Sequence, residues 1–163
     1  MTTSAFAVHC RPNGSEAQLL PEGGVATHVL YAPPVPVRGL SATRVLLPGG
    51  RIIPPQRHPR AETALVALSG YQAVLSGHTM APIKPAPGDV VYIPPGIPYS
   101  VINVSHNAAV IYLAITTDPE FDNGAVPAPE YSGTVADQTV RLRTDHLARI
   151  NSKRASGIRR RRR

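Results

Sequence analysis

The chain has 163 residues, of which 42% are hydrophobic, so it can form one domain with a substantial core but not two of ordinary size. No run of 18 apolar residues occurs, which excludes a membrane-spanning helix. The N-terminal residues lack the basic and apolar pattern of a secretory signal, so we expect a cytoplasmic protein. The single cysteine, Cys10, excludes an internal disulfide and a zinc site built from cysteines.

The net charge of +7 is concentrated at the C-terminal end. Seven of the 17 basic residues lie from Lys153 onward, whereas residues 1–150 carry ten basic and ten acidic residues. Because five consecutive arginines, Arg159 to Arg163, have no apolar partners, we expect residues 151–163 to form a disordered tail. Such a tail allows non-specific, salt-dependent contact with polyanions.

In chain order, polar and turn-rich residues 1–24 predict an N-terminal extension, and residues 25–120 predict a β-barrel. The expected strands are short β-favouring runs bounded by glycine or proline: 27–31, 42–47, 63–68, 71–75, 89–93, 99–104 and 109–116. This spacing, without long helical patterns in between, predicts an all-β antiparallel sandwich or barrel. The run 64–68 is apolar on both faces, which is typical of a central strand buried between two sheets. For residues 121–150 we expect a loop and then a short helix at 140–150.

Residues 50–62 form the first part of a candidate site. Side chains two apart on an extended strand share a face, so Gln56 and His58 point the same way. A turn at residues 59–61 can then bring Glu62 alongside them. An apolar strand follows and ends at Gly70.

Residues 88–103 form the second part. Gly96 and its neighbouring prolines predict a tight turn that aims Tyr99 inward. The alternation of side chains places Tyr99, Val101 and Asn103 on one face of the following strand.

Together the two segments resemble the signature motifs of the cupin superfamily, G-x5-H-x-H-x3-E followed by a glycine and G-x5-P-x-G-x2-H-x3-N. The second motif matches at every fixed position except its histidine, which is Tyr99 here. In the first motif Gln56 replaces the first histidine, and Gly70 comes one residue later than in the common pattern, a minor shift. The resemblance covers about residues 40–118 and implies an all-β, cupin-type double-stranded β-helix (jelly roll) that forms a homodimer.

The resemblance also implies that four side chains meet inside the barrel where the family binds a divalent metal: Gln56, His58, Glu62 and Tyr99. The family's usual set is three histidines and one glutamate. Here one imidazole remains beside oxygen donors, which favours iron or manganese over zinc, nickel or copper. We also expect one or two of three strand tyrosines to line the cavity: Tyr71, Tyr92 and Tyr112.

The resemblance implies a small-molecule enzyme, which we place in a tailoring step of specialised metabolism as a metal-dependent oxygenase, isomerase or cyclase. His58, Glu62 and Tyr99 are the expected catalytic residues. Two alternatives stay open. One is a metal-free enzyme that uses Glu62 and Tyr99 for acid–base catalysis. The other is a non-catalytic metabolite-binding protein, in which the same polar groups satisfy one another by hydrogen bonding.

Overall fold

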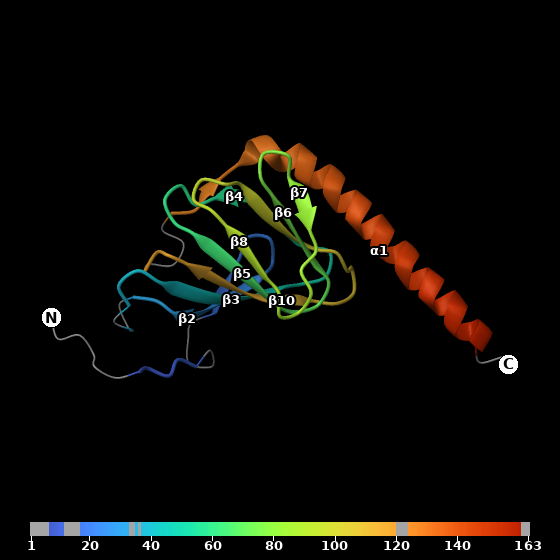
Figure 1. Ribbon diagram of the computed structural model, residues 1–163, viewed down its shortest axis with the longest axis horizontal. Coiled ribbons are helices and arrows are strands. Elements are labelled where there is room, and N and C mark those ends of the chain that lie inside the picture. Colours follow the sequence, from blue (N-terminus) through green and yellow to red (C-terminus); the bar gives the residue numbers. More distant parts are fainter. Residues whose placement is uncertain (1–6, 12–16, 33–34, 36, 120–123, 161–163) are drawn as a thin grey trace.

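The protein is a sandwich of two antiparallel β-sheets with one C-terminal helix, seen in a computed structural model that describes residues 7–11, 17–32, 35, 37–119 and 124–160, with side chains to residue 156 (Figure 1). The six-stranded sheet has the order β1 (Ala17–Leu19), β2 (Val25–Leu30), β3 (Ser41–Leu47), β10 (Val110–Thr116), β5 (Thr63–Ser69) and β8 (Val90–Ile93). The five-stranded sheet has the order β11 (Val126–Pro127), β4 (Ile52–Arg57), β9 (Tyr99–Asn103), β6 (Gln72–Ser76) and β7 (Ala81–Ile83). The expected all-β jelly-roll architecture is confirmed.

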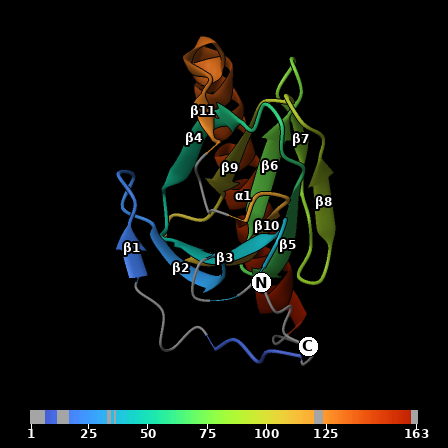
Figure 2. The same ribbon diagram turned by 90° about the vertical axis from the view of Figure 1, so that its left-hand side faces the viewer.

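All seven expected strands are present, with ends that differ by one or two residues. Four further strands are present, of which β4 has six residues and lies inside the five-stranded sheet. The other three, β1, β7 and β11, are only two or three residues long and occupy sheet edges (Figure 2). β1 lies inside the expected N-terminal extension and pairs with β2, so this part of the extension belongs to the sheet.

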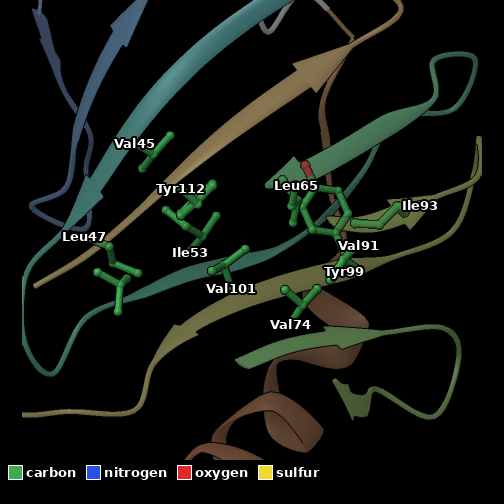
Figure 3. Close-up of a cluster of buried hydrophobic side chains, with 11 residues drawn as sticks. Val45, Leu47, Ile53, Leu65, Val74, Val91, Ile93, Tyr99, Val101 and Tyr112 are labelled. Carbon is green, nitrogen blue, oxygen red and sulfur yellow. The ribbon is translucent and has the colours of Figure 1, made fainter. Parts of the chain in front are cut away.

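The main hydrophobic core lies between the two sheets (Figure 3). The longer central strands contribute alternate side chains to it, such as Val45 and Leu47 of β3, Val91 and Ile93 of β8, and Val101 of β9. These residues are between 0% and 6% exposed. The pleat of the strands therefore decides which polar residues of the motifs can reach the interior.

A second core lies on the outer face of the five-stranded sheet, beneath helix α1 (Ser132–Arg160). Ala73 and Leu75 of β6 pack there with Val135 and Leu142 of the helix, whereas Val74 points to the main core. β6 and β9 are consequently buried on both faces. The prediction that the run 64–68 is buried on both faces was wrong, because its alternate residues lie on the outer face of the six-stranded sheet.

Helix α1 is longer than the expected helix at 140–150. It begins at Ser132, after a 3-10 turn at Pro129–Tyr131, so much of the segment expected to be a loop is regular. It continues to Arg160, into the part of the chain expected to be a disordered tail, and its C-terminal part extends beyond the sheets (Figure 1). The side chains of residues 151–156 are exposed, and residues 161–163 lie outside the described part of the chain. Within the described ranges, no helix is both long and apolar enough to cross a membrane.

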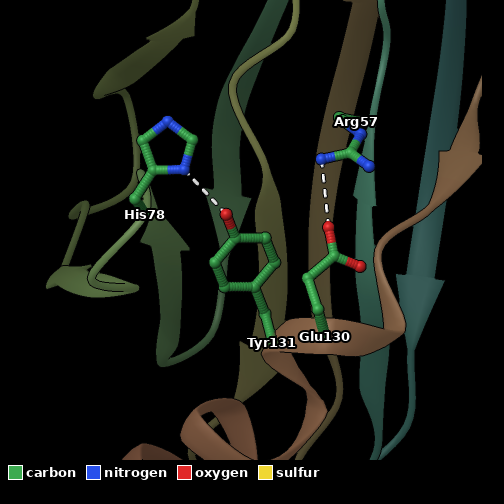
Figure 4. A network of polar contacts seen from close by, with 4 residues as sticks. All are labelled: Arg57, His78, Glu130 and Tyr131. Atoms are coloured by element: carbon green, nitrogen blue, oxygen red, sulfur yellow. Dashed lines mark hydrogen bonds and ion pairs between the residues drawn. The ribbon is translucent and has the colours of Figure 1, made fainter.

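Polar contacts fix the start of the C-terminal segment to the sheet (Figure 4). Arg57 of β4 forms an ion pair of 3.1 Å with Glu130, and Nδ1 of His78 lies 2.7 Å from the Tyr131 hydroxyl. Further along, the Arg143 guanidinium donates to the Asn103 carbonyl at 3.1 Å. Burial against the sheet lowers the pKa of Arg143. These contacts orient α1 along the five-stranded sheet.

The outer face of the six-stranded sheet carries exposed apolar side chains, including Leu46, Leu68 and Val90. A second copy of the chain would pack against this face if the expected homodimer forms. The homodimer stays a prediction.

Replacing Leu142 by Ala should lower the free energy of unfolding by about 2–4 kcal/mol, because this side chain is 4% exposed within the second core. Leu147→Ala is the matched control on the same helix, since Leu147 is 48% exposed, and should change the stability by less than about 0.5 kcal/mol. Urea denaturation measures both values. Equal losses in the two variants would show that α1 does not pack on the sheet as described.

Candidate functional site

Gln56 is placed by the pairing of β4 with β9, in which it lies directly opposite Tyr99. The register of this pair is irregular between Ile53 and Gln56, where two prolines cannot donate hydrogen bonds to the ladder. The Ser100 hydroxyl compensates by donating to the Ile53 carbonyl at 2.6 Å. The two strands therefore stay together across the break, and the side chain of Gln56 faces that of Tyr99.

Tyr99 begins β9 directly after the turn that joins it to β8. In this turn Ile97 N–H donates to the Pro94 carbonyl, and Gly96 has a φ of 78°, a conformation that side chains disfavour. The Gly96 N–H also donates to the His58 carbonyl at 2.8 Å. The second motif thus holds the first in place, and it brings His58 beside Tyr99.

Three of the four predicted side chains meet at the Tyr99 hydroxyl. Gln56 Nε2 donates to it at 3.1 Å, and His58 Nε2 lies 3.2 Å from it. The rings of His58 and Tyr99 are stacked, with centroids 6.1 Å apart. His58 is 8% exposed and Tyr99 4%, so the imidazole and the phenol of this hydrogen-bonded chain are buried.

These groups line a cavity of about 80 Å³ inside the barrel. Aliphatic side chains such as Val45, Ile53 and Leu65 form much of its wall. Gln56 is half-buried, so the cavity reaches solvent on one side. Drug-sized ligands occupy cavities of roughly 300–1,000 Å³, whereas this one suits a molecule of a few heavy atoms or the reacting end of a larger one.

Glu62 lies outside the cavity, and the expectation that it joins the other three side chains was wrong. It precedes β5, where Thr63, Leu65 and Ala67 point inward, so alternation turns Glu62 to the outer face. There its carboxylate accepts a hydrogen bond of 2.7 Å from the exposed Tyr92 hydroxyl.

The position of Gly70 explains this reversal. A Cβ at residue 70 would lie 2.7 Å from the Ala109 carbonyl oxygen, so the close contact with β10 requires glycine there. The register of β5 is irregular between Ala67 and Ser69, and before this irregularity the inward side chain seven residues ahead of Gly70 is that of Thr63. The one-residue shift of the glycine, which we treated as minor, thus moves Glu62 to the opposite face of its strand.

Thr63 is 2% exposed and, within the described part of the chain, its hydroxyl has no hydrogen-bond partner. It pairs across the sheet with Thr116, which lines the cavity. Where the motif would direct a carboxylate inward, the chain therefore presents a neutral hydroxyl.

Three polar residues of the cavity wall were not among the predicted site residues: Glu22, Tyr112 and Thr116. Tyr112 fulfils the expectation for the strand tyrosines, whereas Tyr71 and Tyr92 are 65% and 57% exposed. Glu22 and Thr116 carry no motif signal. The sequence assigned Glu22 to the turn-rich N-terminal extension and gave no indication that it reaches the barrel.

Asn103, the last fixed residue of the second motif, has a structural role. Its fully buried amide donates to the carbonyls of Leu47, Pro48 and Ala108 at 2.8–3.0 Å, and its oxygen accepts from Ser105 N–H. Asn103 therefore ties together the loops at one end of the barrel and does not line the cavity.

The donors that meet in the cavity do not fit the metal centre implied by the resemblance. They supply one imidazole, one amide already bonded to the phenol, and the phenol itself, and the only carboxylate of the described cavity wall is that of Glu22. Divalent metals in proteins are held mainly by imidazole, carboxylate and thiolate groups. Within the described ranges, no three His, Cys, Asp or Glu side chains lie close enough together to hold a metal ion.

A family model described as cupin matches residues 13–136. With the two-sheet jelly roll and the two motifs facing each other across β4 and β9, this places the protein in a class of small barrel proteins with an enclosed site. The chain belongs to the cupin family.

Solved structures share this fold at low sequence identity. KdgF from Halomonas sp. aligns with a TM-score of 0.59 and 16% identity, covering 72% of this chain and 98% of that one. The polyketide cyclase RemF from Streptomyces resistomycificus aligns with a TM-score of 0.59 and 13% identity, covering 73% and 89%. The DMSP lyase DddQ from Ruegeria pomeroyi aligns with a TM-score of 0.58 and 21% identity, covering 74% and 63%. A search of curated proteins gave no match.

Titration of Tyr92 tests the placement of Glu62. The hydrogen bond to the Glu62 carboxylate, followed by desolvation and the nearby negative charge, raises the pKa of Tyr92 above its ordinary value of 10.0. In Glu62→Gln the carboxylate is lost, so the pKa of Tyr92 should fall towards the ordinary value. Tyrosinate absorbance is followed against pH in the parent protein and in Glu62→Gln, each with and without Tyr92→Phe. Subtracting the curve of the protein that lacks Tyr92 leaves the titration of Tyr92 alone. An unchanged midpoint in Glu62→Gln would mean that the carboxylate points elsewhere, for example into the cavity.

Proposed function

We propose that this cupin is an enzyme that acts on a small organic molecule by proton transfer through Tyr99 and His58. The observation that carries the proposal is the hydrogen-bonded chain from Gln56 through the Tyr99 hydroxyl to His58 Nε2, which lines the cavity. Solved structures of the same fold include a polyketide cyclase and a DMSP lyase, so the fold hosts small-molecule reactions. Fold alone does not choose among them.

The geometry gives each residue a role. Gln56 donates to the phenol oxygen, which directs the phenol proton towards His58 and stabilises negative charge on that oxygen. Tyr99 takes a proton from a substrate carbon next to a carbonyl as its own proton passes to His58 Nε2. The electron pair of the broken C–H bond stays on the substrate as an enolate. Return of the proton to another atom completes an isomerisation, and loss of a leaving group completes an elimination.

This proposal keeps the tailoring role in specialised metabolism and changes how the chemistry is done. Glu62, the base in the metal-free alternative, faces Tyr92 on the outer surface, and His58 takes its place. The aliphatic side chains of the wall support the proposal because they limit the contact of water with a reactive enolate.

Exchange of substrate protons with solvent tests proton transfer without knowledge of the product. In D2O, the protein should accelerate deuterium incorporation next to the carbonyl in at least one of hydroxyacetone, aminoacetone and pyruvate, followed by proton NMR. Tyr99→Phe and His58→Asn should reduce the rate by about 10²–10⁴-fold, the usual contribution of a positioned acid or base. Tyr92→Phe removes an exposed tyrosine hydroxyl and serves as the matched control, with no expected change.

Two results would contradict the proposal. Exchange that persists in Tyr99→Phe would remove the phenol from the reaction, and binding of these molecules without any exchange would favour a metabolite-binding protein. Loss of exchange on treatment with a chelator, together with loss in Glu62→Gln, would favour the metal-dependent alternative with Gln56, His58, Glu62 and Tyr99 as ligands.

A further inference from the structure

The β1–β2 hairpin brings a carboxylate to the cavity from outside both motifs. Its loop, Pro21 to Gly23, is closed by hydrogen bonds from Gly23 N–H to the Leu20 carbonyl and from Leu20 N–H to the Gly24 carbonyl, at 2.9 and 2.8 Å. Glu22 lies at the centre of this loop, is half-buried and lines the cavity.

The hairpin is held against the barrel on two sides. Leu20 packs against the main core and also lines the cavity. Gly24 is buried so close to β3 that a Cβ there would lie 3.3 Å from the Leu46 carbonyl oxygen. Because both ends of the loop are fixed, Glu22 is held at the rim of the cavity.

The described cavity wall contains an acidic side chain but no Lys or Arg. Its polar residues are Glu22, Gln56, His58, Tyr99, Tyr112 and Thr116. Arg51 comes near the hairpin, 3.7 Å from where a Cβ of Gly23 would lie, but it is exposed and makes no ion pair with Glu22 among the described residues. Among the described residues of the cavity wall, Glu22 is therefore the only carboxylate, with no basic side chain bound to it.

Two tyrosine rings complete the lining. Tyr99 and Tyr112 are each 4% exposed and present electron-rich aromatic groups to the same cavity. Aromatic rings and a carboxylate together attract organic cations, whereas both disfavour anions.

We propose that Glu22 is the specificity residue of this cavity and selects a small organic ammonium compound. This inference rests on the proposed function, because it names the class of substrate that the same cavity would take. A cavity of about 80 Å³ limits the buried part of the ligand to a few heavy atoms.

Binding of three probes of similar size and different charge tests the inference: n-propylammonium, n-propanol and propionate. Amide shifts in the 1H–15N NMR spectrum of the full chain, at the cavity residues, give the dissociation constants. We expect n-propylammonium to bind more tightly than n-propanol, and propionate to bind weakest. Glu22→Gln should weaken n-propylammonium binding about tenfold, as expected for loss of one charged hydrogen bond. Glu22→Lys should reverse the order and favour propionate.

Glu62→Gln is the matched control, since it removes one carboxylate of the same kind from the outer surface and should leave the order unchanged. Three results would overturn the inference. Propionate could bind as tightly as n-propylammonium, or the preference for the cation could persist in Glu22→Gln. The third result is that n-propylammonium shifts no amide signal of the cavity residues. The assay needs no turnover. In Tyr99→Phe the charge preference should persist when proton exchange is lost, so failure of the proton-transfer proposal and failure of this inference are distinguishable.

Discussion

The pairing of β4 with β9 is the constraint on which the site depends. It sets Gln56 opposite Tyr99, and the turn before β9 adds a hydrogen bond from Gly96 to the His58 backbone. The amide, the phenol and the imidazole therefore meet because the backbone places them together. Ser100 and Asn103 of the same strand stabilise this arrangement through carbonyl groups that the prolines and loops leave unpaired. The polar chain in the cavity is thus supported by a shell of backbone contacts, as a preorganised site requires.

Strand alternation explains why a nearly intact motif gives an altered site. A shift of one residue relative to a fixed point moves every side chain of a strand to the other face. Gly70 is the fixed point, and Glu62 is the residue that changes face. On that face the Glu62 carboxylate accepts a hydrogen bond from the Tyr92 hydroxyl, so it is not left without a hydrogen-bond partner. Gln56 stands where the motif has its first histidine, and Glu62 faces away from the cavity. Both changes lower the expected affinity for a divalent metal, because both remove donors that such a metal prefers.

Much of the fold could be predicted from the sequence, since glycine and proline bound each strand and the motifs fix the turns. The meeting of Gln56, His58 and Tyr99 was predictable from alternation together with the family motif. The face of Glu62 was not, because residues 64–68 are apolar on both faces and do not indicate which face points inward. The early start of α1 was missed because only Val135 and Leu142 of its first three turns are apolar and buried. Glu22 gave no signal, since its position depends on contacts between a hairpin and a distant core.

The carboxylate of this cavity thus comes from a different part of the fold than the motif implies. A glutamate on β5 would stand inside the barrel beside His58, where its charge would be desolvated and would compete for the imidazole. Glu22 is instead half-buried at the rim, where water still solvates it and its charge costs little. His58 therefore stays available to the Tyr99 hydroxyl, and in the proposed reaction the negative charge would act on the ligand rather than on the base. Under the proposed function, separation of the proton-transfer pair from the charged group would let one small cavity both orient a cationic molecule and remove a proton from it.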